Sequence, residues 1–145
     1  MSEPHFMNAD LEIESDSSLN LLEREFGERV VVLYSGRIKR RHCLFLELAR
    51  FTRSWKPAKV IHGLCALVEE LSPAGRKAWD KARRKALDLG YEARFKSTRC
   101  NQFALQPDTV LRVAGLGASL AVTFYREDWF ASTPRPDGYG STNRL

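Results

Sequence analysis

The sequence lacks the features that define several common classes of protein. No apolar run reaches the ~18 residues of a membrane-spanning helix. The opening residues, MSEPHFMNADLEIESD, contain neither the basic segment nor the apolar core of a secretion signal. Cysteine is scarce, and Cys43, Cys65 and Cys100 are widely spaced in apolar runs, which is typical of buried thiols rather than a disulfide framework. We therefore expect a cytoplasmic protein.

Motifs for catalysis are also missing. The Gly-x-Gly of AGLGAS, residues 114 to 119, lies between a helix and a strand, the reverse of the order in a phosphate-binding loop, so we interpret it as a helix end. No pair of carboxylates is placed for acid–base work, and we expect solvent to surround these side chains: Glu12, Glu14, Asp16, Glu69 and Glu70.

A metal site has little support in the sequence. His62 and Cys65 would share one side of a helix, and Cys43 or Cys100 would have to complete the ligand set. Structural zinc sites normally draw close ligand pairs from two turns of the chain, and no such pairs are present. The sequence therefore predicts no catalytic residues, no metal and no cofactor, and we expect a protein that is not an enzyme.

Charge is distributed unevenly along the 145 residues. The net charge is +5, but residues 1 to 36 hold 8 acidic and 2 basic side chains, whereas residues 37 to 99 hold 17 basic and 6 acidic ones. The first segment is thus at −6 and the second at +11. A basic middle of this strength predicts an acidic partner or a nucleic acid.

Periodicity predicts the elements of the first half. Residues 9 to 15 alternate apolar and polar side chains as a strand does, and DSSLNLLEREFG reads as a short helix ending at Gly27. RVVVLYS and HCLFLEL are typical of two strands of a hairpin. Residues 57 to 71 carry apolar side chains at helical spacing.

The second half is interpreted in the same way. Ser72 and Pro73 read as the start of a helix that continues through Trp79, Ala82, Ala86 and Leu89 to residue 90. YEARFKS and NQFALQ are two short strand candidates, a helix begins at residue 107, and SLAVTFY is a last strand.

The expected fold class is α+β, as a single domain over residues 9 to 125. Residues 1 to 8 and 126 to 145 are expected to be flexible termini. The order β-α-β-β-α-α-β-β-α-β predicts a ferredoxin-like core with an added β-α-β, in which helices cover one face of a mostly antiparallel or mixed sheet. We expect twelve apolar side chains to be buried: Leu11, Ile13, Val31, Leu33, Leu44, Leu46, Ile61, Leu64, Val68, Leu111, Leu120 and Val122.

The stretch SGRIKRRHCLFLEL places four basic side chains before an apolar run. In an extended chain, Arg37, Lys39 and Arg41 would share one side, with Ile38 and Arg40 on the other. Like charges on one face contribute nothing to the fold, so contact with a partner is a reasonable role for them. On a helix reaching residue 90, Lys77, Lys81, Arg84 and Lys85 would form a second basic stripe. For both runs, the alternative interpretation is a charged face that only contacts solvent.

Residues 103 to 125, FALQPDTVLRVAGLGASLAVTFY, show an apolar strand, a Pro-initiated helix, Leu116-Gly117, and an apolar strand that ends at Tyr125. With DLEIES and VIHGLCALVEELSP in the same order, the chain resembles a family of small bacterial proteins of unknown function over roughly residues 9 to 125. Some proteins of this type lie beside polymorphic or contact-dependent toxins and are regarded as immunity proteins. The resemblance implies a role in toxin neutralisation and no catalytic residues.

We therefore expect one of two functions. The first is a non-enzymatic protein-binding domain, such as an immunity protein, that contacts an acidic protein partner through Arg37, Lys39, Arg41, Lys81 and Arg84. The alternative is a nucleic-acid-associated protein whose same cations contact phosphates, although no RNA-recognition signature, zinc finger or Gly-x-x-Gly clamp is present.

Overall fold

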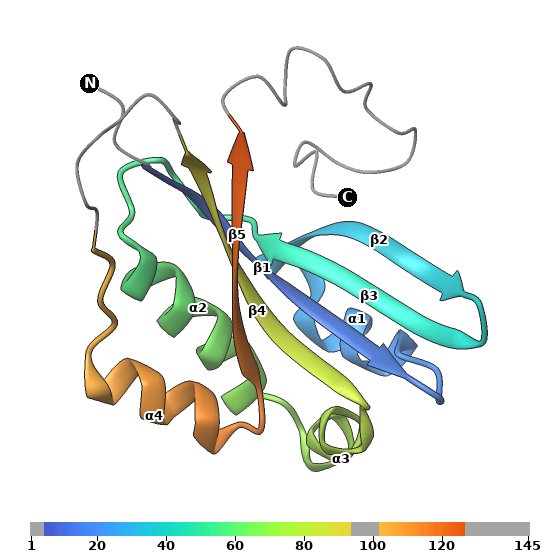
Figure 1. Ribbon diagram of the computed structural model, residues 1–145. Coiled ribbons are helices and arrows are strands. Elements are labelled where there is room, and N and C mark those ends of the chain that lie inside the picture. Colours follow the sequence, from blue (N-terminus) through green and yellow to red (C-terminus); the bar gives the residue numbers. More distant parts are fainter. Residues whose placement is uncertain (1–4, 94–101, 127–145) are drawn as a thin grey trace.

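A computed structural model describes residues 5 to 93 and 102 to 126. Their strands form one five-stranded sheet with the order β2-β3-β1-β4-β5 (Figure 1). The strands are β1 (His5–Ser15), β2 (Val30–Ile38), β3 (Arg41–Leu48), β4 (Arg84–Ala93) and β5 (Ser119–Arg126). The helices are α1 (Asn20–Phe26), the 3₁₀ turn η1 (Gly27–Arg29), α2 (Pro57–Glu69), α3 (Pro73–Lys81) and α4 (Pro107–Gly115).

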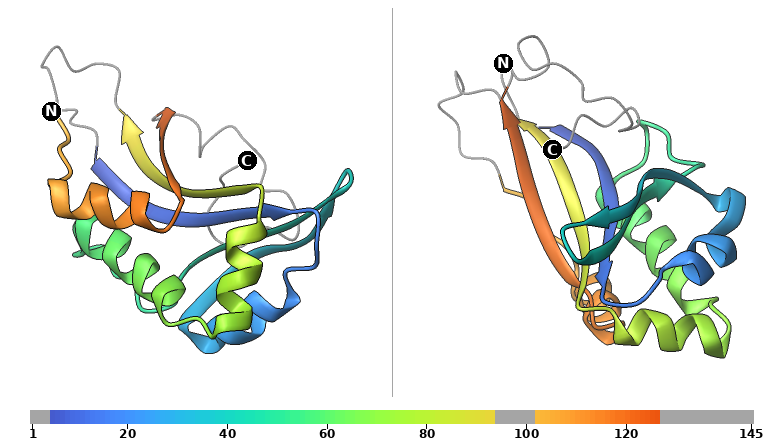
Figure 2. Two further views of the ribbon diagram at one scale, coloured as in Figure 1. Left: turned by 90° about the horizontal axis from the view of Figure 1, so that it is seen from below. Right: turned by 90° about the vertical axis from the view of Figure 1, so that its right-hand side faces the viewer.

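The sheet confirms the predicted α+β class and its ferredoxin-like core. The first four strands are antiparallel to their neighbours in the order β4-β1-β3-β2, and β5 is added parallel to β4. Figure 2 shows the helices on a single face of the sheet. We call the other side of the sheet the back face. None of the helices in the described ranges is long and apolar enough to cross a membrane.

Local signals account for several element boundaries. Gly27 has a positive φ of 57° and ends α1 as predicted, because a residue with a side chain would be strained there. The Ser72 hydroxyl accepts a hydrogen bond from the Gly75 N–H at 3.0 Å, and Pro73 occupies the first turn of α3. Strand β1 begins at His5, before the expected start at residue 9.

The helix predicted to run to residue 90 is wrong in its second half. Helix α3 ends at Lys81, and β4 then runs through the segment between β1 and β5. Leu87, Leu89 and Tyr91 belong to the core, and this spacing of two is that of a strand, so a strand pattern was present within a run that also satisfied helical spacing. Because Arg84 and Lys85 belong to this strand, the predicted basic stripe along α3 does not form.

Of the two short strands predicted after residue 90, the first is confirmed over residues 91 to 93, which form the end of β4. Its remaining residues lie outside the described ranges. Residues 102 to 106 of the second are irregular. Of the predicted tail, Arg126 is the last residue of β5, and residues 127 to 145 lie outside the described ranges, as do Cys100 and the first four residues.

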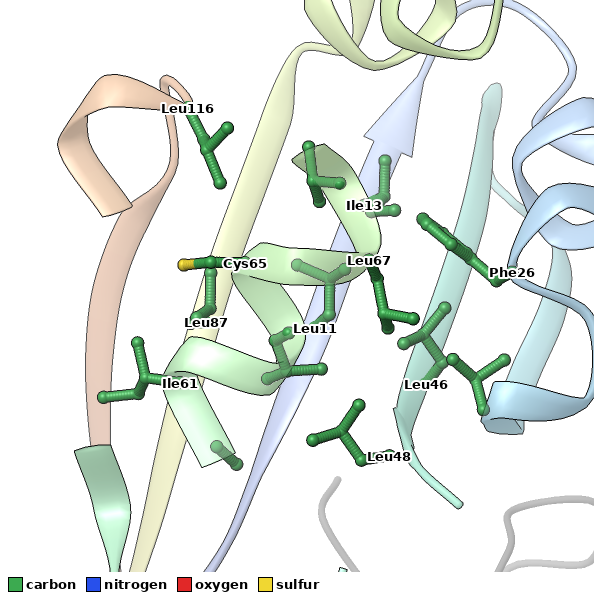
Figure 3. Close-up of a cluster of buried hydrophobic side chains, with 14 of the residues drawn as sticks. Leu11, Ile13, Phe26, Leu46, Leu48, Ile61, Cys65, Leu67, Leu87 and Leu116 are labelled. Atoms are coloured by element: carbon green, nitrogen blue, oxygen red, sulfur yellow. The ribbon is translucent and has the colours of Figure 1, made fainter. Parts of the chain in front are cut away.

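The core lies between the sheet and its helices (Figure 3). Leu11 and Ile13 of β1 meet Leu46 and Leu48 of β3 and the inner side of α2. Eight of the twelve predicted core residues are buried, and Leu120 packs against the cluster while partly exposed: Leu11, Ile13, Leu33, Leu44, Leu46, Ile61, Leu64 and Val68 are the buried eight. The periodicity therefore located most of the core.

Three predicted core residues are exposed. Val31 is 44% exposed because the pairing of β2 with β3 shifts between Val32 and Tyr34, so one alternation cannot hold along the whole strand. Leu111 is 73% exposed because α4 turns Thr109 and Val113 inward instead. Val122 is 51% exposed because β5 is an edge strand.

Candidate functional site

The turn between β2 and β3 exposes three of the four cationic side chains of residues 37 to 41. Arg37, Lys39 and Arg40 are exposed, and no ion pair among the described residues includes any of them. We call these three residues the basic turn. In Figure 2 (left) the turn projects beyond the helix layer. Its cations are therefore accessible to another molecule from several directions.

The backbone of the basic turn is unusual at Lys39. This residue has a φ of 58°, and among the described residues no other residue except glycine has a positive φ. Two-residue hairpin turns require such a conformation, and Gly, Asn or Asp is normally found there. A lysine at this position has a conformational cost that favours a role for its side chain.

A hollow of about 590 Å³ lies beside the basic turn on the back face. Ile38, Cys43 and Phe45 supply its apolar lining, and Glu14 contributes a carboxylate. The remaining lining residues are cationic: Lys39, Arg40 and Arg41. An apolar floor with a charged rim is typical of protein interaction surfaces, where a side chain of the partner inserts and charges surround it.

The prediction that Arg37, Lys39 and Arg41 share one side of the strand is wrong. In the hairpin Arg37 pairs with His42, and Ile38 pairs with Arg41, so Arg37 and Arg41 lie on opposite faces. The alternation fails because the chain reverses through Lys39 and Arg40 instead of continuing as a strand. The cations therefore surround the turn rather than forming a row.

Arg41 and Arg84 do come together, through the carboxylates of β1. Arg84 Nη1 lies 2.8 Å from Glu12 Oε1 and 3.5 Å from Glu14 Oε2. Arg41 Nη1 lies 3.9 Å from the other oxygen of Glu14. Because β1 lies between β3 and β4, Glu14 is directly opposite both Cys43 and Arg84 in register. The two arginines thus share one carboxylate.

Asp16 extends this arrangement past the end of β1. Its Oδ2 lies 2.6 Å from Arg83 Nε, and its Oδ1 lies 3.7 Å from Arg41 Nε. Three arginines, Arg41, Arg83 and Arg84, therefore face three carboxylates, Glu12, Glu14 and Asp16, with no net charge. The expectation that solvent alone surrounds these carboxylates is wrong. We call the six residues the β1 charge cluster.

Lys81 is placed apart from the other predicted contact residues. It is the last residue of α3 and is exposed, and no hydrogen bond or ion pair within the described ranges joins it to the basic turn. The five predicted partner-binding residues thus divide into Arg37 and Lys39 in the turn, Arg41 and Arg84 in the β1 charge cluster, and Lys81 on a helix.

The described cysteines are poor nucleophiles. Burial and, secondarily, the negative charge of Glu14 raise the pKa of the Cys43 thiol, although Cys43 lines the hollow. Burial raises the pKa of Cys65 to about 11. A thiol is reactive as the thiolate, so both groups remain protonated and unreactive at neutral pH.

A polar network between α2 and α4 was not foreseen from the sequence. Arg112 donates to Glu69 Oε2 from Nε at 2.8 Å and contacts His62 Nδ1 at 2.7 Å, and His62 Nε2 lies 2.9 Å from the Thr109 hydroxyl. An arginine beside Nδ1 requires that nitrogen to accept, which places the ring proton on Nε2, facing Thr109. Both ring nitrogens of His62 are therefore in use.

This network fixes α4 against α2 and explains its orientation. Hydrogen bonds from Arg112 are the main cause that lowers the pKa of Glu69. The same contact raises the pKa of Arg112. The i, i+3 spacing of Thr109 and Arg112 is the signal that could have identified this inner face. Within the described ranges no group of three or more His, Cys, Asp or Glu side chains is placed to bind a metal ion.

The geometry thus offers one exposed cationic turn beside an apolar hollow, with a balanced charge cluster next to it. No protein-family model, curated protein or solved structure matches the chain.

Proposed function

We propose that the chain is a non-enzymatic protein-binding domain that contacts an acidic surface of another protein through its basic turn. The observation that carries the proposal is the contrast between neighbouring cations. The arginines of the β1 charge cluster have carboxylate partners, whereas Arg37, Lys39 and Arg40 have none among the described residues. The charges of the basic turn are therefore available to be neutralised by acidic groups of another molecule.

The hollow supports a protein partner over a nucleic acid. Ile38 is exposed beside the cations, and Phe45 and Tyr34 form an adjacent ring pair at 6.0 Å between centroids. Apolar contacts with surrounding charge are typical of protein interfaces, in which complementary potentials accelerate association. An immunity protein that covers an acidic region of a toxin would use such a surface, in line with the family resemblance.

The test compares two triple variants of equal charge. R37E/K39E/R40E reverses the basic turn, and R50E/R53E/K56E reverses three exposed cations in the segment between β3 and α2. Partners retained from a bacterial lysate by the wild type are identified, purified and measured by biolayer interferometry at low and high salt. We expect the turn variant to associate about tenfold more slowly at low salt, and the control variant to stay within about twofold of the wild type.

Two results would contradict the proposal. Equal association rates for the two folded variants would mean that the basic turn is only a solvated strand end. Tight binding of generic duplex DNA or RNA in fluorescence anisotropy, steeply salt-dependent and lost in the turn variant, would instead favour the nucleic-acid alternative. Circular dichroism spectra of both variants establish that they are folded.

A further inference from the structure

Strand β5 is an edge strand without the usual protection against pairing with another strand. Its sequence, SLAVTFYR, contains no proline, and its one charged residue, Arg126, is the last. Its pairing with β4 shows no bulge over eight residues. Edge strands usually carry charges, prolines or bulges, because their free N–H and C=O groups otherwise accept a further strand. Among the described residues, no strand pairs with the outer edge of β5.

The opposite edge of the sheet is protected in the usual way. Strand β2 has a register shift between Val32 and Tyr34, and it ends in the basic turn. A bulge twists an edge, and the like charges repel a second copy of the same edge. The two edges thus differ in the feature that decides whether a strand can be added.

Apolar side chains are exposed along β5. Val122 is 51% and Phe124 is 53% exposed, and both lie on the helix side, since their register partners on β4 are Leu89 and Tyr91. Phe124 stacks with Tyr91 at 5.8 Å between ring centroids. This exposed apolar surface is available to a partner that adds to the edge.

Helix α4 adds to the same surface. Thr109 and Val113 face the core, and Arg112 faces α2. At ~100° per residue, Val110 lies on the side of α4 opposite Arg112, which is the side away from α2, and Leu111 points away from the core. Both side chains are exposed. Exposed apolar side chains of α4 therefore lie beside the exposed apolar side chains of β5.

We propose that β5 pairs antiparallel with β5 of a second copy of this chain, around a two-fold axis at Val122. In this register Val122 lies opposite Val122 of the second copy, and Leu120 lies opposite Phe124 of the second copy. The helix side then carries an unbroken apolar ladder across the join. The two sheets become one continuous sheet with the helices of both copies on one face.

Charge favours a second copy as the occupant. In the same register Arg126 falls opposite Ala118 of the second copy, so no like charges meet along the ladder. The pairing is self-complementary, as a two-fold interface requires, because Leu120, Val122 and Phe124 each meet an apolar side chain of the second copy. The interface lies at the edge opposite the basic turn, so it is independent of the proposed function and leaves one basic turn free on each copy.

Sedimentation equilibrium of the full chain tests the proposal. The wild type should have about twice the 16.5 kDa of one chain, and V122K should dissociate at least about tenfold more readily, since two lysines would face each other at the axis. V31K is the matched control, because it introduces the same residue at a similarly exposed valine on the other edge. We expect V31K to remain dimeric.

A charge-swap experiment tests the register. V122K and V122E should each be monomeric, and an equimolar mixture should restore the dimer, because Lys then faces Glu at the axis. A monomeric wild type would overturn the proposal, as would a V122K chain that dimerises as strongly as the wild type. A mixture that stays monomeric although both variants are folded would overturn the two-fold axis at Val122.

Discussion

Lys39 combines a charged side chain with a backbone conformation that glycine adopts more readily. Its φ of 58° lies in the left-handed region, where a Cβ atom approaches the neighbouring backbone. Arg40, beside it in the same two-residue turn, has no positive φ. The two residues therefore carry the same charge with different conformational costs, and this difference allows charge and conformation to be separated by experiment.

Replacing Lys39 with glycine should keep or raise stability. K39G relieves the left-handed strain, which is of the order of 1 kcal/mol, while it also makes the unfolded chain more flexible, so we expect a gain of between zero and about 1 kcal/mol. R40G removes the same charge without relieving strain and should cost about 0.5 to 1 kcal/mol. Urea unfolding midpoints compare the two. A K39G chain less stable than R40G would show that the lysine side chain supports the fold.

At the scale of elements, charged residues determine how strands and helices meet. Glu14 of β1 contacts arginines from the strands on both sides, and Glu69 of α2 orients α4 through Arg112. Glu25 joins α1 to α3 in a third contact, since its carboxylate accepts from the Ser72 N–H at 2.8 Å and the Ser72 hydroxyl at 2.6 Å. Many of the charged side chains thus join one strand or helix to another.

The contact between Glu69 and Arg112 should make stability depend on pH in acid. The arginine holds the pKa of Glu69 below its ordinary value of 4.5, so the folded state binds this proton less tightly than the unfolded state does. The stabilisation is therefore complete above pH 4.5 and is lost as the pH falls through the folded-state pKa. Because both side chains are about one-third exposed, we expect the contribution to be at most about 1 kcal/mol.

The variant E69Q isolates this contribution. At pH 7 its urea midpoint should lie below that of the wild type, and the difference should shrink as the pH falls well below 4.5, where the wild-type carboxylate is protonated as well. E28Q is the control, since Glu28 is exposed and takes part in no ion pair among the described residues. A difference between E69Q and the wild type that persists unchanged into acid would mean that the charge of Glu69 is not what orients α4.

For the molecule as a whole, local patterns predicted much of the fold, and contacts between distant segments determined the rest. The hairpin, β1 and α2 follow from periodicity, and the start of α3 follows from the short signal Ser72-Pro73. Strand β4 could not be predicted in this way, because the spacing of Trp79, Ala82 and Ala86 suits a helix. The segment is a strand because it pairs with β1 on one side and β5 on the other. Burial within a sheet is a tertiary effect that one segment does not encode.

The candidate site shows the same division. The basic stretch was identified from the sequence, and the turn does expose it. Its division into free and paired cations depends on β1, which reaches Arg41 and Arg84 across two strand pairings. Likewise, the inner face of α4 is chosen by His62 and Glu69 of α2, which is why a polar Thr109 is buried and Leu111 is exposed. Pairs this far apart are invisible to a reading of local periodicity.

One connected core predicts one cooperative unfolding transition. The cluster of buried side chains includes residues from all four helices and from four of the strands, and Leu64 lies within it on α2 at 1% exposure. Trp79 lies in the same cluster on α3, where its indole N–H donates to the Leu116 carbonyl at 2.8 Å. A cavity at Leu64 should therefore weaken the whole domain rather than one end of it.

L64A should lower the free energy of unfolding by about 2 to 5 kcal/mol, through lost burial and the cavity left behind. L111A makes the same chemical change at a side chain that is 73% exposed and should cost less than about 0.5 kcal/mol. Urea unfolding is followed both by tryptophan fluorescence and by far-ultraviolet circular dichroism. The two probes should give one midpoint for each protein, shifted strongly only in L64A. Separate midpoints would show that the helix layer and the sheet unfold independently, and a small effect of L64A would mean that α2 is not central to the core.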